Sequence, residues 1–263
     1  HCISSAASDV YKRQDFIGRD LVIVLGGDGT LTSISHNIDA DTPVIGVNSH
    51  PIEDYPNGSF GFYMDSDVHT FGEDIVTALK GEAIINEIPR LQAIIDTTSG
   101  NRFTTDPAMN DLLIANTHQY APSKYHLRRD GKKCRQQSSG IVFSTWLGQG
   151  AWLNHILEEE TLEKLRNKVD YAEIDSHYFV VSREISHAQR DENPWSWFDW
   201  TDQETVLTSD MHRGYVVPDG WDEVHFNRGA SITVNLEAPK LCLLTFRKPI
   251  TEKLSELIKT KSV

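Results

Sequence analysis

Cysteine is scarce in this chain. The 263 residues include three cysteines, and Cys134 and Cys242 are the only two beyond residue 14. Two thiols cannot build the disulfide framework that stabilises small secreted domains. The scarcity excludes that class of scaffold and predicts a reducing compartment, either the cytoplasm or, in a eukaryotic cell, the mitochondrial matrix.

Long apolar runs and an excess of positive charge are also missing. No stretch approaches the roughly 20 apolar residues that a transmembrane helix needs. The formal net charge of −13 at pH 7 gives an overall field that attracts neither nucleic acid nor an anionic membrane. We therefore expect no nucleic-acid and no membrane partner, and any bound nucleotide has to be held by local backbone amides and a metal ion.

The most informative segment is residues 26–30, Gly-Gly-Asp-Gly-Thr, which directly follows the apolar run 21–25. Such a run, rich in β-branched residues and ended by glycine, is typical of a strand buried on both faces of a parallel sheet. Ligands of these sheets bind at the carboxyl ends of the strands. Clustered glycines let the backbone amides approach a phosphate.

Asp28 lies in the middle of this turn. A carboxylate repels phosphate, so its expected use is to accept a proton from an attacking hydroxyl or to hold a magnesium ion. The alternative is a tight turn in which Asp28 caps the next helix. Spacing alone leaves both interpretations open.

The pattern of residues divides the chain into two parts. Strands and helices alternate in the first part, with strands at 21–25 and 43–48 and helices at 30–38 and 71–80. Hairpin patterns predominate after residue 88. They include a hairpin at 230–246 that turns at Pro239-Lys240, one helix from about 149 to 169, and a final helix at about 250–259.

We therefore predict an α/β + β fold with two domains. The first is an α/β nucleotide-binding domain at residues 15–86, completed by the carboxyl-terminal segment 247–263. The second is a mainly β substrate-binding domain at residues 87–246. Residues 1–14 are set apart, because residues 9–14 read like the translation of a transposon adaptor used for sequencing libraries. We expect this segment to be an artefact that replaces the natural amino terminus.

Four further features complete a resemblance. Asn48 ends the second strand, Met-Asn-Asp-Leu-Leu-Ile occupies 109–114, a glycine-rich turn lies within 138–152, and Asp-Gly stands at 219–220. Together with residues 26–30, their order and spacing resemble the NAD kinase family over nearly all of the chain from residue 15 to 246. The details are most similar to the mitochondrial-type NAD kinases and their bacterial relatives, because Ser139 precedes Gly140 and Trp152 follows the turn.

The resemblance implies an NAD kinase-like fold, with a Rossmann-like α/β amino-terminal domain and a mainly β carboxyl-terminal domain. It also implies transfer of the ATP γ-phosphoryl group to the 2′-hydroxyl of the adenosine ribose of NAD, which makes NADP. Asp28 would be the catalytic base, and Mg²⁺ would arrive with ATP, with no metal ligand assigned on the protein. The implied ATP- and NAD-binding residues are Gly26, Gly27, Gly29, Thr30, Asn48, Asn110, Asp111, Ser139, Thr145, Gly148, Gly150, Trp152 and Asp219. A homodimer or homotetramer is expected.

Several of these positions have simpler interpretations. Asn110 and Asp111 suit recognition of an adenine edge or ribose hydroxyls, but they also suit an ordinary turn before a strand. The glycine-rich turn can be a plain helix start, and Trp152 can be a core residue. Asp219 is in any case a good turn residue.

Two rival functions remain open. Lipid kinases and phosphofructokinases have sequences like residues 26–30, so a lipid or other small-molecule kinase is one alternative. The other is a non-catalytic sensor that binds NAD or NADP, which the altered turn at 146–150 suggests. A sensor would be indifferent to Asp28→Asn, whereas a kinase would keep binding and lose turnover.

Overall fold

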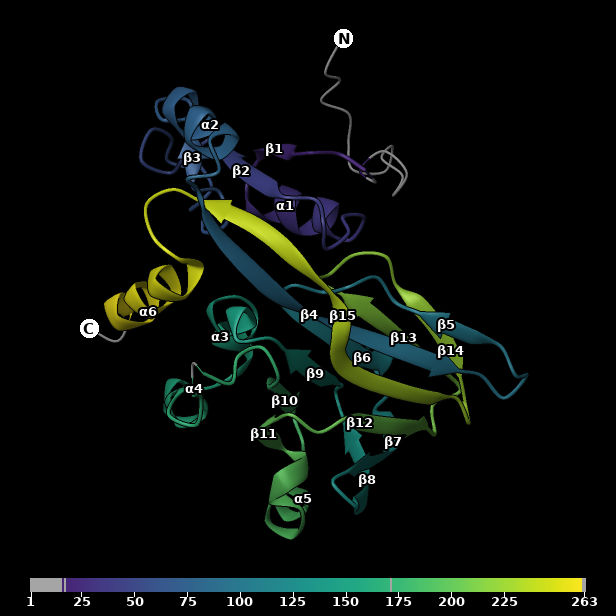
Figure 1. The fold of residues 1–263 in the computed structure, drawn as a ribbon. Coiled ribbons are helices and arrows are strands. Elements are labelled where there is room, and N and C mark those ends of the chain that lie inside the picture. Colours follow the sequence, from purple (N-terminus) through teal and green to yellow (C-terminus); the bar gives the residue numbers. More distant parts are fainter. Residues whose placement is uncertain (1–15, 17, 171, 262–263) are drawn as a thin grey trace. The chain divides into compact units, whose positions relative to one another are not determined.

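The computed structural model describes residues 16, 18–170 and 172–261 (Figure 1). The chain divides into two compact units, one made of residues 1–88 and 239–263 and the other of residues 89–238. The expected artefact at 1–14 lies outside the described residues. No described helix is long and apolar enough to cross a membrane.

The first unit is the predicted α/β layer. Strand β2 is its centre and pairs in parallel with β1, β3 and the last part of β15. The strands and helices of this unit are β1 (Val22–Gly26), α1 (Asp28–Ser35), β2 (Val44–Asn48), β3 (Ser66–Asp67), α2 (Phe71–Leu79) and α6 (Ile250–Lys261). Helix α2 ends before Gly81, whose φ of 73° is the left-handed conformation that favours glycine.

Strand β1 is buried on one face, so the prediction of burial on both faces is wrong for the described residues. Val22 and Val24 are 9% and 2% exposed, whereas Ile23 and Leu25 are 46% and 64% exposed. The cause is position, because β1 is the last strand in the order β1-β2-β15. The apolar run resembles a central strand but lies at an edge among the described elements.

The second unit is mainly β, as predicted. Its six-stranded antiparallel sheet has the order β11-β10-β9-β6-β13-β14. The strands are β6 (Asp111–Asn116), β9 (Ile141–Ser144), β10 (Tyr178–Ser182), β11 (Phe198–Thr201), β13 (Arg213–Pro218) and β14 (Val224–Asn227). A second set pairs β12 (Thr205–Ser209) with β7 (Ser123–Arg129) and with the first part of β15, and β7 with β8 (Lys132–Ser138). Buried apolar side chains of both sets form one core, which includes Leu112, Phe143, Tyr125 and Leu207.

Two long strands lead from one unit to the other. They are β4 (Ile84–Asp96), which pairs with the short β5 (Arg102–Thr104), and β15 (Ser231–Thr245). The predicted hairpin at 230–246 is therefore wrong, because these residues form one continuous strand. Residues 231–234 pair with β12 and residues 243–244 with β2. Pro239 lies between these two registers, and β15 also pairs with β4.

The predicted helix at 149–169 is also wrong in form, because it is three short segments. These are a 3₁₀ turn at Leu147–Gly150 (η3), α3 (Leu153–Ile156) and α4 (Glu159–Arg166). Leu157 and Glu158 are extended, with ψ of 143° and 146°, and separate the two α-helices. The break lets Leu153 of α3 and Leu162 and Leu165 of α4 all reach the same buried cluster. Two short helices, α5 (His187–Glu192) and η4 (Pro194–Ser196), complete the unit.

Candidate functional site

The Gly-Gly-Asp-Gly-Thr segment forms the predicted turn from strand to helix. Gly26 ends β1, and α1 begins at Asp28, two residues earlier than the sequence suggested. The backbone N–H groups of Thr30 and Leu31 donate to the Gly27 carbonyl at 3.0 and 3.2 Å. Only glycine fits at position 26, since a Cβ there would lie 2.5 Å from Thr30 Oγ1. Gly29 and Thr30 are exposed at the start of α1, where the helix dipole favours an anion.

The Asp28 carboxylate is held by backbone from another part of the first unit. The N–H of Tyr63 donates to Oδ1 at 2.7 Å and the N–H of Phe62 donates to Oδ2 at 2.9 Å. Ser59 Oγ accepts from the Asp28 N–H at 3.4 Å. Asp28 is thus not a simple cap of its own helix. The Ser59 hydroxyl also donates to Oδ2, at 3.5 Å, whereas Oδ1 accepts from the Tyr63 N–H and retains a further lone-pair direction for another donor.

Asn48 organises the loop that leads to these amides. Its side chain is 5% exposed, with Nδ2 donating to the Ser59 carbonyl at 3.1 Å and Oδ1 accepting from the His50 N–H at 3.1 Å. A Cβ at Gly61 would lie 2.5 Å from the same Nδ2. Both ends of the Asn48 amide therefore hold the loop at 49–61.

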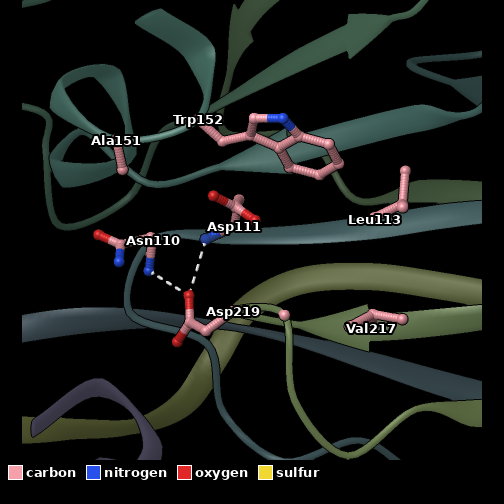
Figure 2. Close-up of a pocket in the computed structure, with 8 residues that line it drawn as sticks. Asn110, Asp111, Leu113, Ala151, Trp152, Val217 and Asp219 are labelled. Carbon is pink, nitrogen blue, oxygen red and sulfur yellow. Dashed lines mark hydrogen bonds between the residues drawn. The ribbon is translucent and has the colours of Figure 1, made fainter. Parts of the chain in front are cut away.

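A second group of predicted residues gathers in the second unit around Asp219. Its carboxylate accepts three consecutive backbone N–H groups, from Met109 at 2.7 Å, Asn110 at 2.7 Å and Asp111 at 3.0 Å. Figure 2 shows two of these bonds. Asp219 has a φ of 47° and Gly220 a φ of 80°. Asp219 therefore closes the turn that begins β6 while tolerating an unusual backbone conformation.

A pocket of about 390 Å³ opens beside this turn. It is lined by Asn110, Asp111, Leu113, Ala151, Trp152, Val217, Asp219 and Gly220. Figure 2 shows the Trp152 indole on one side and Val217 and Asp219 on the other, with the Asp111 carboxylate pointing toward the indole. The Arg183 guanidinium carbon lies 5.2 Å from the centre of the indole and helps to fix it. The volume of this pocket and its mixture of polar and apolar lining residues suit part of a nucleotide.

Asp111 is the one acid here whose ionisation is clearly altered. Burial, together with the negative charge of Asp219, raises the pKa of Asp111 from 3.8 to about 7. At neutral pH the Asp111 carboxyl can therefore either donate or accept a hydrogen bond.

Thr145 and Gly148 bring the glycine-rich turn against the Asn110 backbone. Thr145 Oγ1 donates to the Met109 carbonyl at 2.5 Å, and the Thr145 N–H donates to the Asn110 carbonyl at 2.9 Å. A Cβ at Gly148 would lie 1.9 Å from Ser144 Oγ and 2.5 Å from the Asn110 oxygen. Thr145 and Gly148 are buried and do not line the pocket, but they pack against Asn110, which does. Gly150 ends the same 3₁₀ turn.

Ser139 lies away from this pocket. Strands β6 and β9 pair antiparallel, with Asp111 opposite Ser144 and Ile114 opposite Ile141. Ser139 precedes β9 and is therefore near the opposite end of these strands from Asp111. It is exposed, and its hydroxyl donates to Glu184.

The predicted residues thus divide between the two units, and Ser139 lies apart from the others in the second. Gly26, Gly27, Asp28, Gly29, Thr30 and Asn48 belong to the first, and the remainder to the second. Sequence reasoning missed the pocket residues Leu113 and Val217, although their alternation with buried neighbours along β6 and β13 is a signal for them. It also missed Phe62 and Tyr63, which act through backbone groups and leave no sequence signal.

Comparison with known proteins agrees with this architecture. The ATP-NAD kinase N-terminal domain family matches residues 7–83. An NAD kinase of Clostridium perfringens is 26% identical over 142 residues, which are 53% of this chain and 48% of the relative. An NAD kinase of Thermoplasma volcanium is 23% identical over 248 residues, covering 92% of this chain and 79% of the relative. The chain thus spans about half the length of several curated relatives that it matches.

Solved structures show the same fold. The crystal structure of yeast NADH kinase complexed with NADH superposes with a TM-score of 0.74 at 17% identity, covering 96% of this chain and 70% of that one. An NAD kinase from Archaeoglobus fulgidus in complex with ATP gives a TM-score of 0.64 at 15% identity, covering 91% and 83%. In its motifs, in its fold and in the match of residues 7–83 to the family's amino-terminal domain, the chain is thus similar to the NAD kinases.

Proposed function

We propose that this protein is an NAD kinase, which transfers the γ-phosphoryl group of ATP to the 2′-hydroxyl of the adenosine ribose of NAD and so makes NADP. The observation that supports this most directly is the Asp28 carboxylate. It lies at the carboxyl end of a parallel strand, beside exposed glycine amides, and two backbone N–H groups fix its orientation. Curated relatives named NAD kinase support the same reaction.

Asp28 is the proposed general base. A ribose hydroxyl is a weak nucleophile, and a fixed carboxylate within hydrogen-bond reach accepts its proton as the bond to phosphorus forms. The amides of Gly27 and Gly29 and the amino terminus of α1 face the phosphates. Mg²⁺ that arrives with ATP neutralises phosphate charge, and the exposed start of α1 leaves room for that complex.

The pocket beside Asp219 is the proposed site for the adenosine part of NAD. Trp152 offers a stacking surface for a base. Asn110 and Asp111 supply polar groups for an adenine edge or ribose hydroxyls, and Asp219 positions both through their backbone N–H groups. We further propose a homodimer or homotetramer in the cytoplasm or the mitochondrial matrix.

The test is NADP formation from NAD and Mg-ATP by the wild type and by Asp28→Asn. We expect kcat to fall by about 10²–10⁴ in the variant, with NAD affinity retained. Asp41→Asn is the matched control, because this exposed acid lies in the same unit outside the turn.

Three outcomes would contradict the proposal in different ways. NAD binding without any turnover by the wild type would indicate a sensor. Full turnover in Asp28→Asn would remove Asp28 as the base. Phosphorylation of lipid vesicles in place of NAD would indicate a lipid kinase.

A further inference from the structure

A lysine near the end of the chain contacts the backbone that holds Asp28. Lys253 lies on α6, and its Nζ donates to the Phe62 carbonyl at 2.7 Å and to Asp65 Oδ1 at 3.0 Å. The Phe62 carbonyl belongs to the same peptide group as the Tyr63 N–H, which donates to Asp28 Oδ1 at 2.7 Å. One peptide group therefore connects the ammonium of Lys253 to the carboxylate of Asp28.

This arrangement strengthens the hold on Asp28. A cation at the carbonyl oxygen polarises the peptide and makes its N–H a better donor, because hydrogen bonds in a chain reinforce one another. The ammonium also fixes the plane of the peptide, which sets the direction from which the Asp28 carboxylate is held. Lys253 Nζ also lies 5.8 Å from the centre of the Phe62 ring, on the same short segment.

Lys253 is itself held by a buried ionic cluster in the first unit. The Asp65 side chain is 5% exposed and accepts from the backbone N–H groups of Phe246 at 2.6 Å and Arg247 at 3.2 Å. Arg247 makes two bonds to Asp74, at 2.9 and 3.1 Å. Although burial opposes ionisation, the bond from Phe246 and the charge of Lys253 keep the pKa of Asp65 below its usual value. The Lys253 ammonium therefore has a fixed, ionised partner.

We propose that Lys253 is a positioning residue for Asp28, acting through the peptide group between Phe62 and Tyr63. The inference rests on the proposed role of Asp28 as the base. It assigns to the carboxyl-terminal helix a part in setting the geometry of the reaction, in addition to its packing on the first unit.

The first experiment compares Lys253→Met with Lys253→Arg and Lys248→Met. We expect Lys253→Met to lower kcat by about 10–100-fold, since small misplacements of a reacting group have effects of that size, while KM for NAD stays unchanged. Lys253→Arg keeps the positive charge and should restore most of kcat. Lys248 is the matched control, because its ammonium pairs with Glu252 and Glu256 on the same segment. An unchanged kcat in Lys253→Met, or a loss that Arg does not restore, would overturn the proposal.

The second experiment is hydrogen exchange at the Phe62 and Tyr63 amides, which does not depend on activity. We expect faster exchange at Tyr63 in Lys253→Met and in Asp28→Asn, and wild-type exchange in Lys248→Met. Unchanged exchange at Tyr63 would overturn the proposal even if kcat had fallen, because the loss would then not act through this peptide group. If the wild type makes no NADP, the proposed reaction fails, while faster Tyr63 exchange in Lys253→Met would still establish the connection to Asp28.

Discussion

Gly148 determines how closely the glycine-rich turn approaches the Asn110 backbone. A Cβ at this position would overlap Ser144 Oγ at 1.9 Å and the Asn110 carbonyl at 2.5 Å. We predict that Gly148→Ala lowers the free energy of unfolding by about 1–3 kcal/mol, as overpacking of a buried site does, and weakens NAD binding because Asn110, which lines the pocket, is displaced. Urea unfolding and NAD titration measure both effects.

Gly72→Ala is the control for this substitution. Gly72 is in the first turn of α2 and has nothing within 4 Å of its Cβ position. Alanine there should be neutral or stabilising by up to about 1 kcal/mol. If Gly148→Ala were as stable as the wild type, the turn would have room for a Cβ, and the close approach to Ser144 and Asn110 would not determine stability.

Asp111 gives the folded protein a specific dependence on pH. Its pKa is about 7 in the folded protein against 3.8 in the unfolded chain, so folding takes up a proton between these values. The free energy of unfolding contributed by this group therefore falls as pH rises from 3.8 to about 7 and is constant above. Asn at position 111 cannot titrate, so Asp111→Asn lacks this pH dependence. The free energy of unfolding of the variant minus that of the wild type should therefore increase between pH 3.8 and about 7, with a slope of up to about 1.4 kcal/mol per pH unit.

Urea unfolding at several pH values and constant ionic strength measures this slope. Asp96→Asn is the control, because Asp96 is exposed and the Arg102 guanidinium lowers its pKa. Asp96 stabilises the folded protein fully at pH values above the pKa that it has in the unfolded chain. This stabilisation is lost only as the pH falls through the lower pKa that it has in the folded protein. Parallel curves for Asp111→Asn and the wild type between 3.8 and about 7 would contradict the shift of Asp111.

At the scale of the elements, the start of α4 lacks a side-chain cap. Glu158 is the N-cap residue, with extended backbone and no side-chain bond to the first turn. We predict that Glu158→Ser raises the free energy of unfolding by about 0.5–1 kcal/mol, because a serine oxygen accepts from the free N–H groups of that turn. Thermal unfolding would show it.

The matched substitution is Glu163→Ser on the exposed face of the same helix. Serine has a lower helix propensity than glutamate and cannot cap in mid-helix, so this variant should lose a few tenths of a kcal/mol. If both variants lose stability, the break at residues 157–158 is not a true helix start.

Local elements were predictable and long-range ones were not. The turn at 26–30 follows from neighbouring residues and is present. The strand through Pro239 could not be distinguished from a hairpin, because its two halves pair with strands that are distant in sequence. The partners of Asp28 are backbone groups more than thirty residues away, and no sequence pattern identifies them.

At the scale of the whole molecule, each unit has its own core. The large apolar cluster runs from Leu91 to Val234 and the cluster around α3 and α4 lies within 113–200, so both belong to residues 89–238. The cluster around Ile45, Val47 and Leu244 belongs to the first unit. Every residue that lines the pocket beside Asp219 also comes from the second unit. The proposed NAD binding and the proposed phosphoryl transfer are therefore separable in principle.

We predict that the fragment 89–238 folds alone and binds NAD without phosphorylating it. The two apolar clusters described for this unit lie within the fragment, so it should unfold cooperatively, and its NAD affinity should lie within about tenfold of the whole chain, a difference of about 1.4 kcal/mol. It lacks Asp28 and should make no NADP. Trp152→Ala in the same fragment is the control, because loss of a stacking surface costs about 1–3 kcal/mol of binding. A cooperative fragment that does not bind NAD, or that binds it equally well without Trp152, would show that the pocket beside Asp219 is not the site of the nucleotide.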